Sequence, residues 1–222
     1  MSRRIIDLTL TIREGMQTFP THWHPVVEIT QLGRHGIENR ETRKITMGTH
    51  TGTHMDAPRH FIPGGATIEQ ISLDQLVGHA TVVDLTGFAP QTEIGPAELA
   101  AAVGSRPVER VILRFDWCRH VGTWTYYNDH PFLSEDAARW LVENGCRLVA
   151  SDTPQTDNPK NGSRTPNDSP NHKILLGRGV VLVEYLTNLA QLSRDQVELV
   201  VAPLKIEGSD GAPLRCFAIE ED

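Results

Sequence analysis

A cluster of histidines around one aspartate, close to residue 50, places the tightest constraint on how this chain can fold. His50 and His54 are four residues apart, and Asp56 follows two residues later. His60 comes four residues after Asp56. Neutral imidazole and carboxylate suit zinc, manganese or iron as ligands, and the absence of a nearby cysteine disfavours a structural zinc site. The segment therefore predicts a site for a divalent metal.

Regular secondary structure cannot bring the first three of these side chains to one ion. On an α-helix Asp56 would leave the face that His50 and His54 share. On a straight strand His50 and Asp56 would lie ~20 Å apart, at ~3.3 Å per residue. We therefore expect the chain to bend at Gly52, because glycine tolerates the backbone angles of a sharp turn. Beyond the bend, strand alternation would point His54 and Asp56 to one side, and Pro58 would end the strand.

Asp56 and His60 offer such a site different chemistry. The two oxygens of a carboxylate can bridge two cations, which a neutral imidazole cannot do, so Asp56 is the candidate bridging ligand. An imidazole beside an acidified water can take or give a proton, so His60 is the candidate catalytic residue. The chain has no Gly-x-Ser-x-Gly motif and no phosphate-binding glycine loop, so no competing nucleophile or nucleotide site is predicted.

Composition and charge disfavour several other classes of protein. The 222 residues are 39% hydrophobic and 22% charged, which is typical of a globular chain. With 28 acidic against 21 basic residues, the net charge of −7 disfavours binding to nucleic acid. No run of ~18 apolar residues is present, so we expect no membrane span, and we expect no secretory signal. Three widely spaced cysteines, at 118, 146 and 216, predict a reducing, cytoplasmic location.

Hydrophobic periodicity and turn residues predict an α/β fold with a mixed sheet, in one domain over 1–222, because no linker or repeat divides the chain. We expect strands over 5–10, 26–32, 41–47, 81–85, 108–115, 147–150, 180–184, 197–206 and 214–219. We expect helices over 68–77, 96–103 and 134–144, the last between an N-cap at Ser134 and a stop at Gly145. Residues 152–170 contain almost no apolar side chain and predict a long loop, which is often functional.

Aromatic residues gather between Trp117 and Phe132, a segment that holds five of the thirteen in the chain. Two interpretations are open. Aromatic side chains in a loop can contact a flat, partly apolar substrate or a second subunit. They can also form a small core beneath the loop.

The run from His50 to Phe61, HTGTHMDAPRHF, resembles the signature of the cyclase family of metal-dependent hydrolases, which includes bacterial kynurenine formamidases and isatin hydrolases. The similarity extends over most of the chain, through Ile6–Thr9, Ser151–Pro154, His172–Glu184 and Ala202–Pro213. It implies a fold of the swivelling β/β/α type, with helices flanking the mixed sheet. It also implies a homodimer or higher homo-oligomer with the site near the subunit interface.

The resemblance implies five metal ligands, which are His50, His54, Asp56, His172 and Glu184. In the formamidase branch, two zinc ions lie side by side. The first would be held by His50, His54 and Asp56, and the second by Asp56, His172 and Glu184. The isatin hydrolase branch uses a single manganese, held through the same leading motif, so zinc (one or two ions per chain) and manganese both stay open.

The implied activity is cleavage of a C–N amide bond in a small, aromatic molecule, either an N-formylkynurenine-like amide or an isatin-like cyclic amide. Metal-activated water would attack the carbonyl carbon, and His60 would move protons. A lactone hydrolase, a metal-dependent cyclase or lyase, and a non-catalytic small-molecule binding protein are the alternatives. The formamidases carry a Trp-Pro-Gly-Asp stretch where this chain reads QTFPTHWHP, at Gln17–Pro25. We expect this segment to line the substrate pocket and to alter the substrate.

Overall fold

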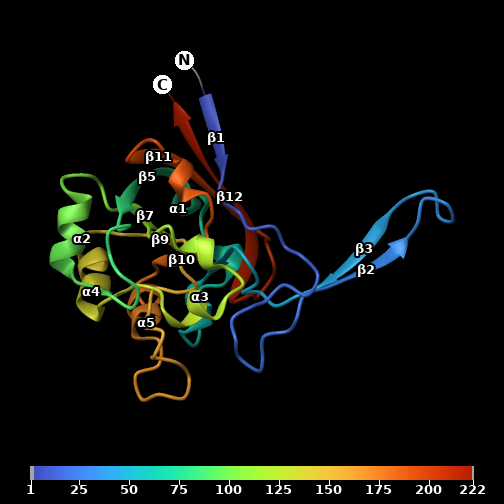
Figure 1. Ribbon diagram of the computed structural model, residues 1–222, viewed down its shortest axis with the longest axis horizontal. Coiled ribbons are helices and arrows are strands. Elements are labelled where there is room, and N and C mark those ends of the chain that lie inside the picture. The colour runs from blue at the N-terminus through green and yellow to red at the C-terminus, as the bar shows by residue number, and fades with distance from the viewer. Residues whose placement is uncertain (1–2, 222) are drawn as a thin grey trace.

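A closed, mixed β-sheet forms the centre of the fold in the computed structural model, which describes residues 3–221 (Figure 1). Its strands are β1 (Arg3–Asp7), β4 (His54–Asp56), β5 (Val77–Asp84), β7 (Arg110–Arg114), β9 (Leu148–Ser151), β10 (Val181–Glu184), β11 (Gln196–Pro203) and β12 (Gly211–Glu221). The order is β1-β12-β11-β5-β7-β9-β10-β4, and β4 also pairs with β12. This second pairing closes all strands except β1 into a barrel-like sheet. The predicted mixed α/β architecture is confirmed.

Helices cover the outer face of the parallel strands β5, β7, β9 and β10. These helices are α2 (Pro96–Val103), α4 (Glu135–Glu143) and α5 (Pro170–Leu176), and Figure 1 shows them on one side of the sheet. Alternate strand residues bury on opposite faces. Ile112 lies in the core inside the barrel, whereas Val111 and Leu113 lie in the core beneath the helices. Burial on both faces explains why these strands read as continuous apolar runs.

Short elements complete the chain. They are the one-turn α-helix α1 (Leu73–Leu76), α3 (Trp124–Asn128), the pair β6 (Glu93–Ile94) and β8 (Phe132–Leu133), and the 3-10 turns η1 (Pro58–His60), η2 (Ile68–Gln70), η3 (Trp117–His120) and η4 (Leu189–Gln191). Within residues 3–221, no helix has the length and apolar character needed to cross a bilayer.

Local sequence signals account for both ends of helix α4. The Ser134 hydroxyl accepts a hydrogen bond from the backbone N–H of Ala137, so Ser134 caps α4 as expected. Gly145 has φ +81° directly after the helix, a conformation that favours glycine.

The predicted helix over 68–77 is wrong. Thr67 and Gln70 close a capping box around the single turn η2, and Ile71 then adopts extended backbone angles. Ser72 is extended as well, so α1 is one turn long, and β5 already begins at Val77. The apolar spacing of the segment therefore reflects two short turns that pack on the barrel.

The segment between Trp117 and Phe132 belongs mainly to the core beneath the helices. Trp117, Tyr126 and Tyr127 are buried there, and only Trp124 among the tryptophans and tyrosines of this segment is largely exposed. Core packing therefore holds for these three rings, which join the large core beneath the helices and not a small core of their own.

A two-stranded arm extends from the body of the molecule (Figure 1). It consists of β2 (Glu28–Gly33) and β3 (Thr42–Thr46), which form a sheet of their own. Its apolar side chains Leu32, Ile37 and Ile45 are each more than half exposed. Isolated hairpins are marginally stable in water, and this arm buries few apolar side chains that could stabilise its conformation.

Candidate metal centre

The closing strand β4 carries His54 and Asp56 into the interior. Gly52 has φ +59°, so the bend expected from the spacing of the cluster is present. β4 pairs with β10 on one side, where His54 is opposite Glu184, and with β12 on the other, where Asp56 is opposite Gly211. Alternation along three residues points His54 and Asp56 to the same side.

His172 reaches the same place from the first turn of α5. Pro170 begins this helix, and its fixed φ suits the first helical position. The His172 side chain is 5% exposed, as is that of Glu184. Two segments that are distant from the histidine cluster in sequence thus complete the centre, and the His172–Glu184 similarity had pointed to both.

The buried carboxylates of Asp56 and Glu184 each lie close to both His54 and His172. His54 Nε2 lies 3.3 Å from Asp56 Oδ1 and 3.6 Å from Glu184 Oε2. His172 Nε2 lies 3.3 Å from Asp56 Oδ2 and 3.3 Å from Glu184 Oε1. Ligands at ~2.0–2.2 Å around a tetrahedral ion are about 3.3–3.6 Å apart. Asp56 and Glu184 therefore offer one oxygen toward His54 and the other toward His172, at the spacing of metal ligands.

Two oxygens of this centre are left without a hydrogen-bond partner. Asp56 Oδ2 and Glu184 Oε1 are both buried and unsatisfied. Unpaired buried carboxylate oxygens are costly, and a divalent cation between them would satisfy both. The donor set of imidazole and carboxylate is also the one that zinc, manganese and iron accept, so these residues fit a divalent metal.

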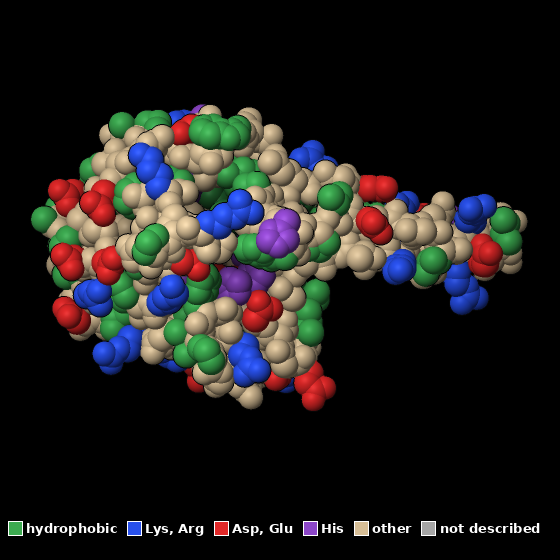
Figure 2. All heavy atoms as spheres, turned by 90° about the horizontal axis from the view of Figure 1, so that it is seen from below, with side chains coloured by type: hydrophobic (Ala, Val, Ile, Leu, Met, Phe, Trp, Pro, Cys, Tyr) green, Lys and Arg blue, Asp and Glu red, His purple; other side chains and the backbone are tan. Residues whose placement is uncertain are grey.

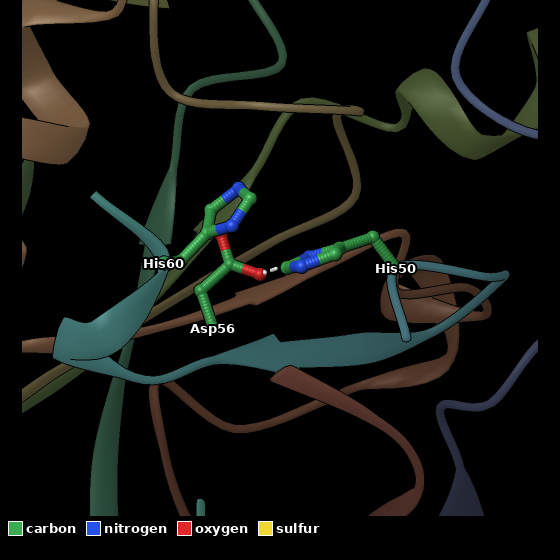
Figure 3. Close-up of side chains that lie close together, drawn as sticks. All are labelled: His50, Asp56 and His60. Carbon is green, nitrogen blue, oxygen red and sulfur yellow. Dashed lines mark hydrogen bonds and ion pairs between the residues drawn. The ribbon is translucent and has the colours of Figure 1, made fainter. Parts of the chain in front are cut away.

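His50 and His60 both lie next to the Asp56 carboxylate (Figure 3). His50 Nδ1 is 2.7 Å from Asp56 Oδ1, and the His50 and His60 rings are 3.9 Å apart between centroids. His50, Asp56 and His60 form one group of possible ligands, and His54, Asp56 and Glu184 form another.

A hydrogen bond holds the outward-facing nitrogen of each of three histidine rings. His54 Nδ1 donates to the Gly52 carbonyl at 2.8 Å. His172 Nδ1 donates to Asp157 Oδ2 at 2.5 Å, and His50 Nε2 donates to Asp210 Oδ2 at 2.8 Å. Such partners fix the ring and leave the opposite nitrogen free to bind a metal.

Sequence reasoning missed Asp157 and Asp210. Asp157 ends a buried stretch, 152–157, of the segment expected to be a long loop, and residues 158–168 form its exposed or half-exposed part. Asp210 directly precedes β12, in the stretch that resembles the cyclase family. No spacing in the sequence links either aspartate to a histidine 15 or 160 residues away.

In the metal-free centre, protons on the histidines balance the negative charges of the buried carboxylates. Burial alone would raise the pKa of Asp56, but the positive charges of His50 and His60 lower it well below 3.8. Burial would lower the pKa of His172, but the neighbouring carboxylates, Asp157 first, raise it well above 6.5. His50 has its pKa raised to about 10, because the Asp56 charge outweighs burial. The metal-free protein therefore holds protons where a metal would bind.

We expect metal affinity to rise with pH. A histidine with a raised pKa keeps its proton through neutral pH, and ligation requires the neutral ring, so binding releases that proton. One to two released protons make affinity rise about 10- to 100-fold per pH unit between about pH 6 and 8. Competition against a chromophoric chelator, corrected for the protonation of the chelator, measures this slope. A flat profile would contradict the charge balance described above.

Asp157→Asn is expected to weaken metal binding by about 10- to 100-fold, as outer partners of ligating histidines do when they are changed. Asp157 Oδ1 also accepts the backbone N–H of Asn171, so the asparagine can keep that bond while it loses the charge beside His172. The same competition assay measures the effect. Asp195→Asn is the control, because the Asp195 side chain is 76% exposed. Equal affinities in the two variants would show that Asp157 does not support the centre.

The centre opens into a cavity of about 680 Å³. Phe19, Trp23 and His24 line one side, so the Gln17–Pro25 segment lies where it was expected. Lys160 and Arg164, from the loop before α5, also line the cavity. Figure 2 shows histidine side chains gathered in the hollow, with a Lys or Arg side chain at its edge. An apolar and aromatic wall with a few polar groups is typical of small-molecule sites.

Comparison with known proteins shows the family to which this chain belongs. The sequence profile of the family described as "Putative cyclase" matches residues 6–158. The kynurenine formamidase of Salinibacter ruber (strain DSM 13855 / M31) is 34% identical over 214 residues, which cover 95% of each chain. The kynurenine formamidase of Bacillus cereus (strain ATCC 14579) is 31% identical over 213 residues, which cover 95% of this chain and 94% of the relative.

Solved structures share the fold. Isatin hydrolase A from Labrenzia aggregata, bound to benzyl benzoate, superposes with a TM-score of 0.88 at 28% identity, over 99% of this chain and 94% of that one. A structure described as a potential metal-dependent hydrolase with cyclase activity superposes with a TM-score of 0.80 at 29% identity, over the full length of both chains.

Proposed function

Since the chain belongs to the Putative cyclase family, we propose that it is a metal-dependent amidohydrolase that cleaves a C–N amide bond of a small aromatic molecule. One observation carries this proposal. Asp56 and Glu184 each present one oxygen to His54 and the other to His172, at ligand spacing and in the floor of a cavity. The relatives are kynurenine formamidases and isatin hydrolases, whose names describe hydrolysis of aromatic amides.

We propose that two groups of residues bind the metal. His50, His54 and Asp56 form the first, and Asp56, His172 and Glu184 form the second. The contacts of Asp56 Oδ1 with His50 and His54, and of Asp56 Oδ2 with His172, support this division. Zinc, as one or two ions per chain, or manganese would suit these ligands.

A divalent cation in this centre supplies the positive charge that polarises a carbonyl group and makes water acidic. Asp56 and Glu184 would hold the metal where the substrate can reach it, because both are buried and line the cavity. His60 lines the cavity with its side chain 26% exposed, so it can take a proton from water and deliver it to the leaving nitrogen. Phe19 and Trp23 offer an apolar surface to the aromatic part of the substrate.

The proposal is tested by assaying protein purified without chelator and then reloaded with zinc or manganese. We expect hydrolysis of N-formyl aromatic amides or of isatin, with one ¹⁸O atom from labelled water in the product. Product without label would indicate a cyclase or lyase, and activity on lactones alone would indicate a lactonase. Failure to bind zinc, manganese or iron would overturn the mechanism.

The two cations of the cavity favour a substrate that carries a negative group. Lys160 and Arg164 form no ion pair with any carboxylate in residues 3–221, so their charges are available to a ligand. We expect Lys160→Gln and Arg164→Gln each to raise KM about five- to tenfold for a carboxylate-bearing substrate, since charged hydrogen bonds are worth ~1.5–3 kcal/mol before solvent screening.

The matched substrates for this measurement are 2-formamidobenzoate, which carries a carboxylate, and formanilide, which does not. Arg178→Gln is the control variant, because Arg178 is exposed and does not line the cavity. Equal changes in KM for the two substrates would show that Lys160 and Arg164 do not recognise charge.

We propose that the chain forms a homodimer through the arm of β2 and β3. Burial against a second copy would cover Leu32, Ile37 and Ile45 and stabilise a hairpin that has little to stabilise it alone. Sedimentation at the mass of one chain would contradict this. The single domain over 1–222, the swivelling β/β/α arrangement and the cytoplasmic location stay predictions, and the three free cysteines support the last.

A further inference from the structure

We propose that Asp210 is a positioning residue, which holds the His60 ring in place for proton transfer and couples it to the metal centre. This inference rests on the proposed function. Asp210 Oδ2 lies 3.0 Å from His60 Nδ1 and 2.8 Å from His50 Nε2. One carboxylate oxygen thus joins a candidate metal ligand to the candidate catalytic residue.

The backbone around Asp210 is fixed by the closure of the barrel. Its carbonyl accepts the N–H of Ala57 at 2.9 Å, one residue beyond β4. The next residue, Gly211, pairs with Asp56 across β12 and β4. A Cβ at Gly211 would lie 2.7 Å from His50 Cε1, so the His50 ring packs directly on this backbone. The Asp210 carboxylate is therefore placed by the same strand pairing that places Asp56.

The side chain of Asp210 is oriented as well as the backbone. Thr49 Oγ1 donates to Asp210 Oδ1 at 3.1 Å, which leaves Oδ2 for the two histidines. Both oxygens are thus engaged by residues around the histidine cluster, and Asp210 contributes no free oxygen to a metal. Its place is behind the rings, as the outer partner of both.

The consequence for His60 is a fixed tautomer. A carboxylate oxygen can only accept, so His60 Nδ1 must carry the proton that it donates to Asp210. Nε2 of the neutral ring is then the nitrogen that can accept a proton from water. Without the carboxylate, the ring could rotate or adopt the other tautomer, and each change would remove the base from its place.

The test combines a double-mutant cycle with a spectroscopic measurement. The variants are Asp210→Asn, His60→Ala and the double variant, with Asp195→Asn as control, all saturated with zinc. We expect Asp210→Asn to lower kcat about 10²- to 10⁴-fold with little change in KM, the range found for general acid–base groups and their orienting partners. In the His60→Ala background, we expect the same change to lower kcat by no more than about twofold.

The second measurement does not depend on the substrate. ¹⁵N-edited NMR of the zinc-loaded protein at pH 8.5 reports which His60 nitrogen carries the proton. We expect the Nδ1–H form in the wild type and a mixture in Asp210→Asn. If Asp210→Asn does not fold, Thr49→Val, which frees Oδ1, is expected to change the tautomer population and kcat in the same direction by less.

Two results would overturn the inference. One is an equal loss of kcat from Asp210→Asn with and without His60, which would mean that Asp210 acts through His50 or through the fold. The other is an unchanged His60 tautomer in both Asp210→Asn and Thr49→Val. A wild type that is inactive on every amide would refute the proposed function instead, and the NMR result would still decide the role of Asp210.

Discussion

Replacing Asp56 with asparagine is expected to abolish both metal binding and hydrolysis. Asp56 is fully buried, and its two oxygens face opposite histidines, His54 and His172. An asparagine keeps one acceptor but turns an N–H₂ group toward one of them, so neither half of the centre keeps its ligands. We expect kcat/KM to fall by at least about 10³-fold, which corresponds to about 4 kcal/mol.

Metal content by mass spectrometry and amidase activity, measured on the same preparation, check this prediction. Removing one partner of a buried charged pair can cost ~3–5 kcal/mol of stability, so circular dichroism must show that the variant is folded. Asp195→Asn carries the same chemical change at an exposed position and should match the wild type. A folded Asp56→Asn protein with full metal content would refute the assignment of Asp56 as a ligand.

Replacing His60 with alanine is expected to separate chemistry from metal binding. His60 stacks on His50 and lines the cavity, but it lies outside the contacts that join Asp56 and Glu184 to His54 and His172. We therefore expect metal content to stay within the error of the wild type. Loss of a general acid–base group lowers kcat by about 10²- to 10⁴-fold.

Steady-state kinetics at saturating metal provide the measurement, and added imidazole provides a control. Partial recovery of kcat with imidazole is expected, because a free base can enter the space that the side chain vacates. His120→Ala is the matched comparison, since the His120 ring packs on Trp117 and does not line the cavity. Full activity of His60→Ala would exclude the proton-transfer role.

The histidine cluster and the local geometry around it could be predicted from sequence because both depend on neighbouring residues. The bend at Gly52 follows from spacing alone, and the helix after Ser134 follows from its cap. Family resemblance was needed for Glu184 and His172, because strand pairing with β4 and the placement of α5 bring them in.

Other features could not be predicted, for physical reasons that differ from case to case. The helix over 68–77 failed because a capping box can close one turn as readily as start a helix. Asp157 looked like part of a polar loop, yet it is buried because two backbone N–H groups and the His172 ring satisfy its carboxylate. Asp210 depends on the pairing of the last strand with the fourth, a contact that no local pattern encodes.

The position of β4 links completion of the fold to the site. This three-residue strand pairs with both β10 and β12, so it is the seam at which the barrel closes, and it carries His54 and Asp56. Strands that pair over long sequence separations assemble late, because loop closure must come first. A chain in which β4 has not yet paired with β10 and β12 contains every ligand residue, but these residues are not yet brought together. A metal that binds only the assembled site would therefore stabilise the closed barrel. Tight metal binding would indicate that the barrel has closed.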